Sequence, residues 1–338
     1  MEVNNKYGVK GKKLLLWSII GVVVLLCLAF ILEYYTDFNQ TDGERDLFTL
    51  SGQENLAVSD GRLYYCDVLK ENALCSYHLE TKEILMIEEA EGKLKKTGTG
   101  VYYIVENAVY RIVEDDLLEL FRIPAKNFTF IDCCGDIVYW IARETKAKEK
   151  EESSYTLEYL YAQKISSETE PKLLFHQEDE DVRDAVVARD CIYLMTDKGI
   201  YCTEPGKEEL KKISDYSGLK FYGDGICIFI KEKADTAKEG YFEVTPEGQL
   251  KRLTGRSGLT ATIFEGEIYY PWNNYLWKKN LGKEEEQEYM LAELPGYAWY
   301  AMEAYEEGVF MRGYLSYDIW YYDISSDTSE CIIKQREE

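Results

Sequence analysis

Histidine is nearly absent from this chain, since His78 and His176 are the only two among 338 residues. Histidine is the usual proton-transfer group near neutral pH and a common metal ligand, so most acid–base triads and most zinc sites are excluded. The sequence also lacks the G-x-S-x-G, G-x-x-x-x-G-K, H-E-x-x-H and C-x-x-C patterns. We therefore expect no metal site and no cofactor, and no catalytic residue can be named from a motif.

Positive charge is scarce as well. Lysine and arginine number 39 against 62 acidic residues, which gives a formal net charge of -23 and an isoelectric point near 4.6. Such a surface repels nucleic acid and bare anionic lipid, so a nucleic-acid partner is not expected. Apolar residues make up 46% of the chain, which is enough to bury a sizeable core and excludes disorder throughout.

One long apolar run stands near the amino terminus, from Leu14 to Leu32. Its 19 residues carry no charge and as a helix would span about 28 Å, close to the thickness of a bilayer core. Four lysines precede the run and mainly acidic residues follow it, so the positive-inside rule places the amino terminus in the cytosol. A cleaved signal peptide is the alternative, but Glu-Tyr-Tyr-Thr follows the run in place of small residues.

We therefore expect a single-pass protein of the cell membrane with an extracytoplasmic carboxyl-terminal domain. The predicted segments are a cytosolic tail at 1–13, a transmembrane helix at 14–32, a tether at 33–53 and a folded domain at 54–338.

The folded domain repeats with a period of about 41 residues. One marker strand opens with glycine or aspartate and continues with apolar and aromatic residues. It recurs seven times, at Gly61, Gly100, Gly135, Asp190, Gly225, Gly266 and Gly308. A second aromatic strand trails each marker, from Leu74 to Ile319, with the same mean spacing. Shorter alternating segments precede and follow each pair, so each repeat contains four short strands.

Four strands in about 41 residues is the spacing of a propeller blade, so the chain is predicted to be all-β, a seven-bladed β-propeller preceded by one transmembrane helix. Most of the 29 tyrosines fall in the two recurring strands, and we expect their rings to fill the space between blades. How the ring closes is open: Asp46 to Leu50 would either pair beside Cys331 to Ile333 or belong to the tether.

The marker segments Leu63 to Asp67, Val138 to Trp140 and Ile268 to Tyr270 resemble the YWTD strand of low-density-lipoprotein-receptor propellers, although the full tetrapeptide occurs nowhere. The repeat pattern from Glu54 to Glu338 also resembles uncharacterised propellers tethered to bacterial membranes. This resemblance implies a fold and a location, and it assigns no site.

Loops that join the second strand to the third, and one blade to the next, share a face that collects the insertions. The longest is predicted from Arg143 to Ser154. Binding residues concentrate on loops of rigid scaffolds, so this face is the candidate contact surface. Trp272, Tyr297 and Trp299 are predicted to form an aromatic ligand-binding platform there. The alternative is that Trp299 lines the channel and Trp272 caps a turn.

Eight cysteines follow the apolar run. Cys66 and Cys75 would face each other across a hairpin if its turn centred on Lys70 and Glu71, and a disulfide would then be within reach. Most of the eight cysteines stand at apolar strand positions, however, so the sequence favours buried free thiols, and the disulfide is the alternative.

The sequence thus favours a membrane-anchored extracytoplasmic propeller that binds or scaffolds a protein, peptide or glycan partner. The alternative is an enzyme acting on carbohydrate or peptide with carboxylates at the channel mouth. Two or three acids with perturbed pKa values that converge in one pocket would favour the enzyme, whereas an exposed aromatic or charged face without such convergence would favour a scaffold.

Overall fold

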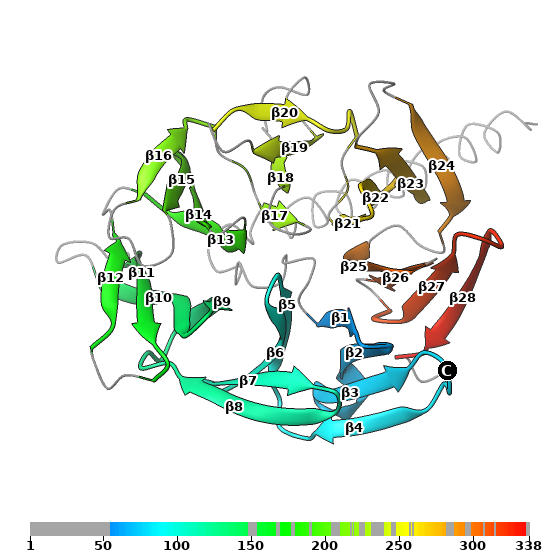
Figure 1. Cartoon of the computed structure of the whole chain (residues 1–338), viewed down its shortest axis with the longest axis horizontal. Helices are drawn as coiled ribbons and strands as arrows, with labels where there is room; N and C mark the ends of the chain where they lie inside the picture. Colours follow the sequence, from blue (N-terminus) through cyan, green and yellow to red (C-terminus); the bar gives the residue numbers. More distant parts are fainter. Residues whose placement is uncertain are drawn as a thin grey trace, which may run out of the picture. The chain divides into compact units, whose positions relative to one another are not determined.

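The computed structural model contains seven antiparallel sheets of four strands each, which follow one another along the chain. It describes residues 55–335 except for 148–153, 167–169, 177–179, 189–190, 204–209, 217, 219, 223–226, 231–239, 245–247, 257, 259, 282–286, 295–298, 307 and 314–315. Figure 1 shows the sheets side by side around a common centre, with the first strand of each sheet innermost.

The strands are numbered in chain order. Sheet 1 contains β1 (Leu56–Ser59), β2 (Arg62–Asp67), β3 (Ala73–His78) and β4 (Ile84–Glu88); sheet 2 contains β5 (Lys93–Thr97), β6 (Gly100–Val105), β7 (Ala108–Val113) and β8 (Asp116–Arg122). Sheet 3 contains β9 (Phe128–Cys134), β10 (Ile137–Ala147), β11 (Ser154–Lys164) and β12 (Lys172–Phe175); sheet 4 contains β13 (Val182–Ala188), β14 (Cys191–Thr196), β15 (Gly199–Thr203) and β16 (Lys211–Ser214).

Sheet 5 contains β17 (Lys220–Tyr222), β18 (Cys227–Ile230), β19 (Gly240–Val244) and β20 (Leu250–Arg252). Sheet 6 contains β21 (Thr262–Phe264), β22 (Glu267–Trp272), β23 (Tyr275–Asn280) and β24 (Glu288–Glu293), and sheet 7 contains β25 (Trp299–Tyr305), β26 (Gly308–Gly313), β27 (Ile319–Asp323) and β28 (Thr328–Ile333).

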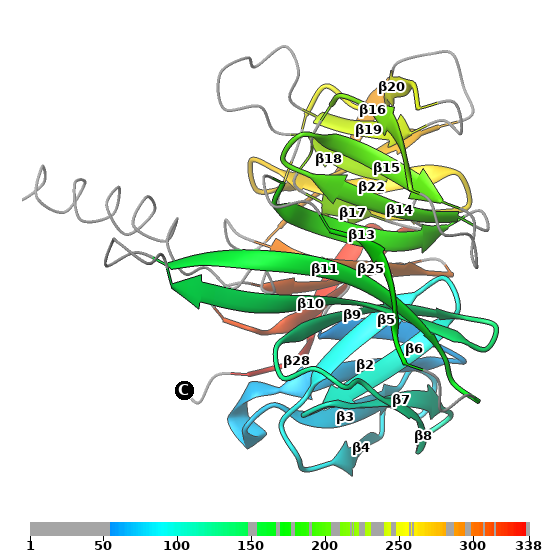
Figure 2. The same cartoon turned by 90° about the vertical axis from the view of Figure 1, so that its left-hand side faces the viewer.

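Consecutive strands pair antiparallel in every sheet, as the sequence repeats predict. Seven four-stranded sheets in this order are consistent with a seven-bladed β-propeller. Loops between first and second strands, and between third and fourth, lie at one end of the ring, which we term the hairpin end. The remaining loops, including those between sheets, lie at the opposite end, which we term the connection end. Figure 2 shows the sheets from the side.

The glycine that opens several marker strands is the second residue of a two-residue turn. Between β1 and β2, Asp60 and Gly61 have φ angles of 51° and 71°, and between β21 and β22, Glu265 and Gly266 have φ angles of 50° and 75°. Positive φ at both central residues matches the right-handed twist of a hairpin, and glycine adopts this conformation without a steric penalty.

Adjacent aromatic residues in the second strand of a sheet serve two different interfaces. Successive side chains of a strand point to opposite faces of the sheet. Accordingly, Tyr64 packs in the cluster between sheets 1 and 2, whereas Tyr65 packs in the cluster between sheets 7 and 1. In sheet 2, likewise, Tyr102 packs in the cluster between sheets 2 and 3, and Tyr103 packs in the cluster between sheets 1 and 2. The prediction that tyrosine rings fill the space between sheets is confirmed at these positions.

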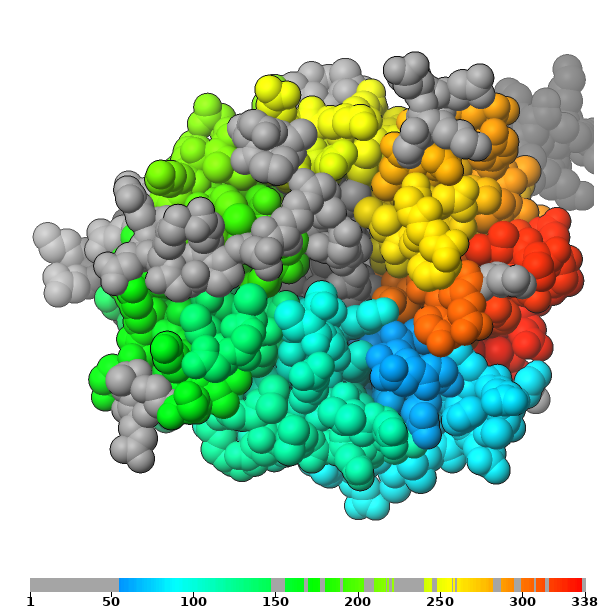
Figure 3. Space-filling model, in the orientation of Figure 1, coloured from blue at the N-terminus to red at the C-terminus, as the bar shows by residue number. Residues whose placement is uncertain are grey.

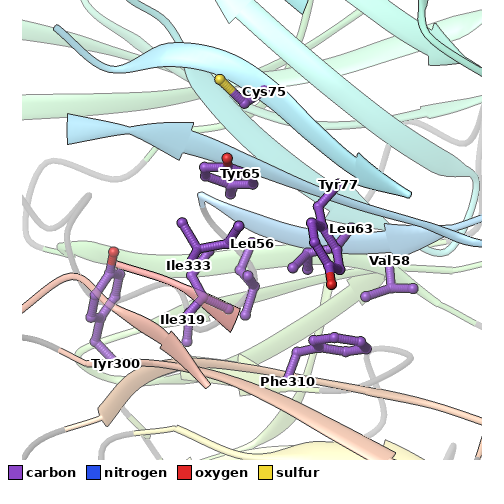
Figure 4. Close-up of a cluster of buried hydrophobic side chains, with 11 residues drawn as sticks. Leu56, Val58, Leu63, Tyr65, Cys75, Tyr77, Tyr300, Phe310, Ile319 and Ile333 are labelled. Atoms are coloured by element: carbon purple, nitrogen blue, oxygen red, sulfur yellow. The ribbon is translucent and has the colours of Figure 1, made fainter. Parts of the chain in front are cut away.

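The seven buried apolar clusters link the sheets into a closed cycle. Each cluster draws residues from two neighbouring sheets, and one of them joins sheet 7 to sheet 1. In that closing cluster, Leu56 and Tyr65 of sheet 1 lie beside Ile319 and Ile333 of sheet 7 (Figure 4). Figure 3 shows the first sheet, in blue, in contact with the last, in orange and red.

Polar contacts reinforce this closure. The Arg312 side chain is 1% exposed, and its two terminal nitrogens donate to the carbonyl oxygens of Asn55 at 2.7 Å and Cys66 at 2.6 Å. The backbone N–H of Val68 donates to Oε1 of Gln335 at 2.8 Å. Sheet 7 therefore holds sheet 1 through side-chain contacts, and within the described residues each sheet consists of consecutive strands only.

The predicted loop from Arg143 to Ser154 is wrong at both ends. β10 continues to Ala147 and β11 begins at Ser154, so Arg143 lies directly opposite Glu158 in the ladder. Their side chains form an ion pair with 2.6 Å between Nε and Oε1. Opposite charges on facing residues stabilise strand pairing. Interpreting these charged residues as a solvated loop therefore ends the predicted strand too early.

The disulfide alternative for Cys66 and Cys75 is also wrong. The chain leaves β2 through a short 3-10 turn, η2 (Val68–Lys70), and the ladder pairs Cys66 with Leu74 and Cys75 with Tyr65. This register differs by one residue from a turn centred on Lys70 and Glu71. A shift of one residue places two side chains on opposite faces, so each cysteine packs in a different intersheet cluster.

None of the helices in the part of the chain that the structure describes is long and apolar enough to cross a membrane. The predicted tail at 1–13, transmembrane helix at 14–32 and tether at 33–53, with Asp46 to Leu50, lie outside the described residues.

We expect Arg312→Lys to weaken ring closure. A lysine lacks the planar fork that reaches two carbonyl oxygens at once, and hydrogen bonds to a charged group contribute about 1.5–3 kcal/mol each. The free energy of unfolding, measured by urea titration of the full chain in a neutral detergent, should fall by about 2–3 kcal/mol. The exposed Arg122→Lys is the control and should change it by less than about 0.5 kcal/mol. Equal midpoints for the two variants would contradict this account.

Candidate functional site

A cavity of about 410 Å³ opens at the hairpin end between sheets 6 and 7. Its lining comes from turns and strand ends of both sheets, namely Phe264, Glu265, Glu267, Tyr269, Asn280, Glu306, Ile324 and Ser325. Two features therefore position it: the tight turn after β21 and the turn after β25, which bring Glu265 and Glu306 to the same opening. Both of these glutamates have positive φ, at 50° and 49°.

The cavity combines an apolar wall with carboxylates. Phe264, Ile324 and the ring of Tyr269 supply the apolar part, while Glu265 and Glu306 are exposed at the opening. A long side chain that ends in a positive charge matches this combination, because its methylene stem can lie on apolar surface while its head meets carboxylates.

The inner carboxylate, Glu267, is held in place by two neighbours. The Tyr269 hydroxyl donates to its Oε2 at 2.7 Å, and Nζ of Lys278 lies 3.1 Å from the same oxygen. Burial, together with the adjacent Glu267, raises the pKa of Tyr269. The phenol therefore stays protonated at neutral pH and remains a hydrogen-bond donor to Glu267.

The structure describes two of the three residues predicted to form the aromatic platform, and it places these two, Trp272 and Trp299, in different intersheet clusters. Trp299 is buried in the cluster between sheets 6 and 7 and offers no face to a surface ligand. Trp272 is half-buried, and its ring meets Trp277 edge-on with 5.8 Å between centroids. The Arg256 guanidinium lies 4.9 Å from the Trp272 ring. Tyr297 lies outside the described residues. Of the two described residues, only Trp272 is partly accessible, and the platform itself stays a prediction.

Sequence reasoning selected the connection end and missed the cavity at the hairpin end. A usable signal was present, since an acidic residue stands at the turn after the first strand in consecutive repeats, at Glu265 and Glu306. Among the described residues, no group of three or more histidine, cysteine, aspartate or glutamate side chains is placed to hold a metal ion.

A second polar arrangement lies on the innermost strands. Asp132 of β9 is almost fully buried, and its Oδ1 accepts from Oγ1 of Thr97 at 2.8 Å, from the Thr99 hydroxyl and from the backbone N–H of Cys133 at 2.7 Å. Its Oδ2 is buried without a hydrogen-bond partner in the structure. Burial therefore raises the pKa of Asp132, against the opposing effect of the threonine hydrogen bonds.

An ion pair between Lys96 of β5 and Glu303 of β25 links sheets 2 and 7. Sheet 1 stands between these two in the ring, so the pair reaches across its innermost strand (Figure 1). Burial raises the pKa of Glu303, and the nearby Lys96 ammonium opposes that shift. This pair belongs to the ring closure and is separate from the cavity between sheets 6 and 7.

Comparison of the sequence with protein-family models and with curated proteins finds no match. Solved structures do match. The acylaminoacyl peptidase of Pyrococcus horikoshii aligns over 85% of this chain and 53% of its own, with 12% identity and a TM-score of 0.54. The chain thus spans about half the length of that peptidase.

Two further similar structures are BamB from Moraxella catarrhalis and a nidogen/laminin complex. The BamB alignment covers 72% of this chain and 74% of BamB, with 12% identity and a TM-score of 0.42. The nidogen/laminin alignment covers 70% of this chain and 90% of the other, with 10% identity and a TM-score of 0.39. At 10% to 12% identity the matches concern the fold alone.

We expect Asp132→Asn to flatten the pH dependence of stability. Because burial raises the pKa of Asp132 in the folded state, the folded protein binds that proton more tightly than the unfolded chain. The contribution of protonated Asp132 to the free energy of unfolding is therefore present at acid pH. It is lost as the pH rises from the pKa of Asp132 in the unfolded chain through its higher pKa in the folded protein. Relative to wild type, the asparagine variant should gain stability as the pH rises above the unfolded pKa of aspartate, about 3.9, and the gain should level off above the folded-state pKa, at about 1.4 kcal/mol per tenfold difference in proton affinity.

Urea titrations of both proteins at several pH values measure this effect. Asp116→Asn, at an exposed position in β8, is the matched control and should leave the slope unchanged. A constant difference between wild type and Asp132→Asn at every pH would contradict the raised pKa.

Proposed function

We propose that this chain is a membrane-anchored extracytoplasmic β-propeller that binds a protein, peptide or glycan partner, and that the cavity between sheets 6 and 7 receives a basic side chain of that partner. The cavity carries the proposal, because it joins an apolar wall to two exposed glutamates at one opening. A lysine or arginine side chain has the length, the apolar stem and the charge that this lining requires.

The sequence supports the membrane anchor. The uncharged run from Leu14 to Leu32 has the length of a transmembrane helix, and the lysines before it favour a cytosolic amino terminus. A propeller held at a membrane surface would present its ends to partners outside the cell.

The ring supports a binding or scaffold role. Both faces of each sheet pack against neighbours, so the loops at the two ends are carried on a rigid frame. Loops on rigid frames are where binding residues concentrate. The acidic character of the whole chain, with a net charge of -23, would also speed the approach of a basic partner.

A matched pair of small peptides tests the proposal on the full chain in a neutral detergent. One is acetyl-Gly-Arg-Gly-amide, and the other carries citrulline, the uncharged isostere of arginine, at the centre. Calorimetry should show the arginine peptide binding about tenfold more tightly, which corresponds to about 1.4 kcal/mol. The double variant Glu265→Gln and Glu306→Gln should remove this preference, because it removes the two carboxylates at the opening.

A second double variant, Glu114→Gln and Glu119→Gln in sheet 2, changes the net charge equally and should retain the preference. Equal binding of both peptides to the wild type would overturn the proposed ligand. Cleavage of the peptide or of a supplied oligosaccharide, lost on Glu267→Gln, would replace binding with the enzymatic alternative.

A further inference from the structure

The outermost strands of the ring differ in how their free edges are protected. The edge of a sheet presents unpaired backbone groups, and proteins usually protect it with lysine, proline or other polar residues. β12 and β16 begin with lysine, β20 contains Lys251 and Arg252, and β28 begins with Thr-Ser-Glu. These four edges therefore carry the ordinary protection.

The outermost strand of sheet 1, β4, has less of this protection, since its only polar residue is Glu88 at the end of the strand. Its residues Ile84, Leu85 and Met86 are consecutive and aliphatic, and they are 53%, 49% and 43% exposed. The strand contains no lysine, arginine or proline. The outermost strand of sheet 6, β24, which begins and ends with glutamate, likewise contains no lysine, arginine or proline. Within the described residues, β4 pairs with β3 alone, so its other edge has no strand beside it.

The hydrogen bonds of the hairpin show which backbone groups this edge presents. The backbone N–H of His78 donates to the carbonyl of Glu83 at 2.9 Å, so these two form a hydrogen-bonded pair. Pairs alternate along an antiparallel ladder, and the next pair is Tyr77 with Ile84. The N–H and carbonyl of Ile84 therefore point away from β3, toward the open edge.

The charge around β4 identifies the chemistry of an occupant. From Glu80 to Lys93 the sequence carries five glutamates and two lysines. Glu83 precedes the strand, and Glu89 follows it, and both are exposed. A second copy of this chain would bring the same carboxylates to the contact on top of a net charge of -23, so the edge disfavours self-pairing.

We propose that β4 is a docking edge for an extended segment of a partner protein in which aliphatic and basic residues alternate. The segment would add a strand to sheet 1, with its backbone bonded to the outward groups of β4 and its basic side chains near the flanking glutamates. This site lies on sheet 1 and does not depend on the cavity between sheets 6 and 7.

The probe is the peptide acetyl-KVKVKVKV-amide, added to the full chain in a neutral detergent at about 0.15 M salt, a concentration at which exposed charges are screened beyond about 8 Å. Binding is measured by calorimetry, and the edge is observed by hydrogen exchange with mass spectrometry. The peptide should slow exchange in the segment that contains Ile84 to Glu88. A peptide of equal charge with two valines replaced by proline cannot form a strand, and it should bind at least tenfold more weakly.

Two substitutions at one position separate side chain from backbone. Ile84→Thr keeps the outward N–H and the strand propensity and should weaken binding about threefold. Ile84→Pro also removes the N–H, which no ladder bond uses, and should weaken binding at least tenfold. Leu173→Thr is the control, because Leu173 is 48% exposed on the lysine-bearing edge of β12, and it should bind as the wild type does.

Four outcomes would overturn the proposal. In the first, the two peptides bind equally well, and in the second, Ile84→Pro has a native circular dichroism spectrum and binds the peptide as the wild type does. In the third, the peptide slows hydrogen exchange only outside β4. In the fourth, the chain forms a concentration-dependent dimer through β4 without any peptide. Loss of binding in the Glu265→Gln and Glu306→Gln variant would assign the peptide to the cavity between sheets 6 and 7. The two sites thus fail independently.

Discussion

Every sheet in this molecule must bury both of its faces, and the ring follows from that requirement. A lone four-stranded sheet with aromatic residues on both faces would leave apolar surface in water at a cost of about 25 cal/mol per Å². Adjacent residues such as Tyr64 and Tyr65 point to opposite faces, so each sheet needs a neighbour on both sides. An open row would leave two faces uncovered, whereas a closed cycle leaves none.

At the closure between sheets 7 and 1, side-chain contacts of the described residues hold the two sheets together. An apolar cluster joins the two sheets, and the buried Arg312 reaches two carbonyl oxygens on sheet 1. The ion pair of Lys96 with Glu303 reaches past sheet 1 to sheet 2. Such buried charges stabilise a structure only while their partners are in place, which ties the position of three sheets together.

The sequence allowed the fold to be predicted because its signals are local and repeated. A turn glycine, an aromatic pair and a fixed period each occupy a few adjacent residues. The errors arose where the outcome depends on pairing between strands. A one-residue change of register separates Cys66 from Cys75. The pairing of Arg143 with Glu158 extends the hairpin of β10 and β11 into a charged segment that was predicted to be a loop.

The candidate cavity was missed for a related reason. Glu265 and Glu306 are 41 positions apart in the sequence, and only the packing of sheet 6 against sheet 7 brings their turns to one opening. The repeat predicted that neighbouring sheets would touch, but not which of the two ends would be hollow. Burial of Trp299 within the same interface is likewise a property of intersheet packing, which the position of a residue in a loop-rich region does not reveal.

Within the residues that the structure describes, the same two-sided burial limits where the ring can bind a partner. Since the sheet faces are used to close the ring, the surfaces left are its two ends and the outermost strands. The described cavity lies at one end, and β4 is an outermost strand with exposed aliphatic residues and no basic residue. Carboxylates border both. Because a like-charged partner would add repulsion at either place, the chemistry of both surfaces favours segments that carry lysine or arginine.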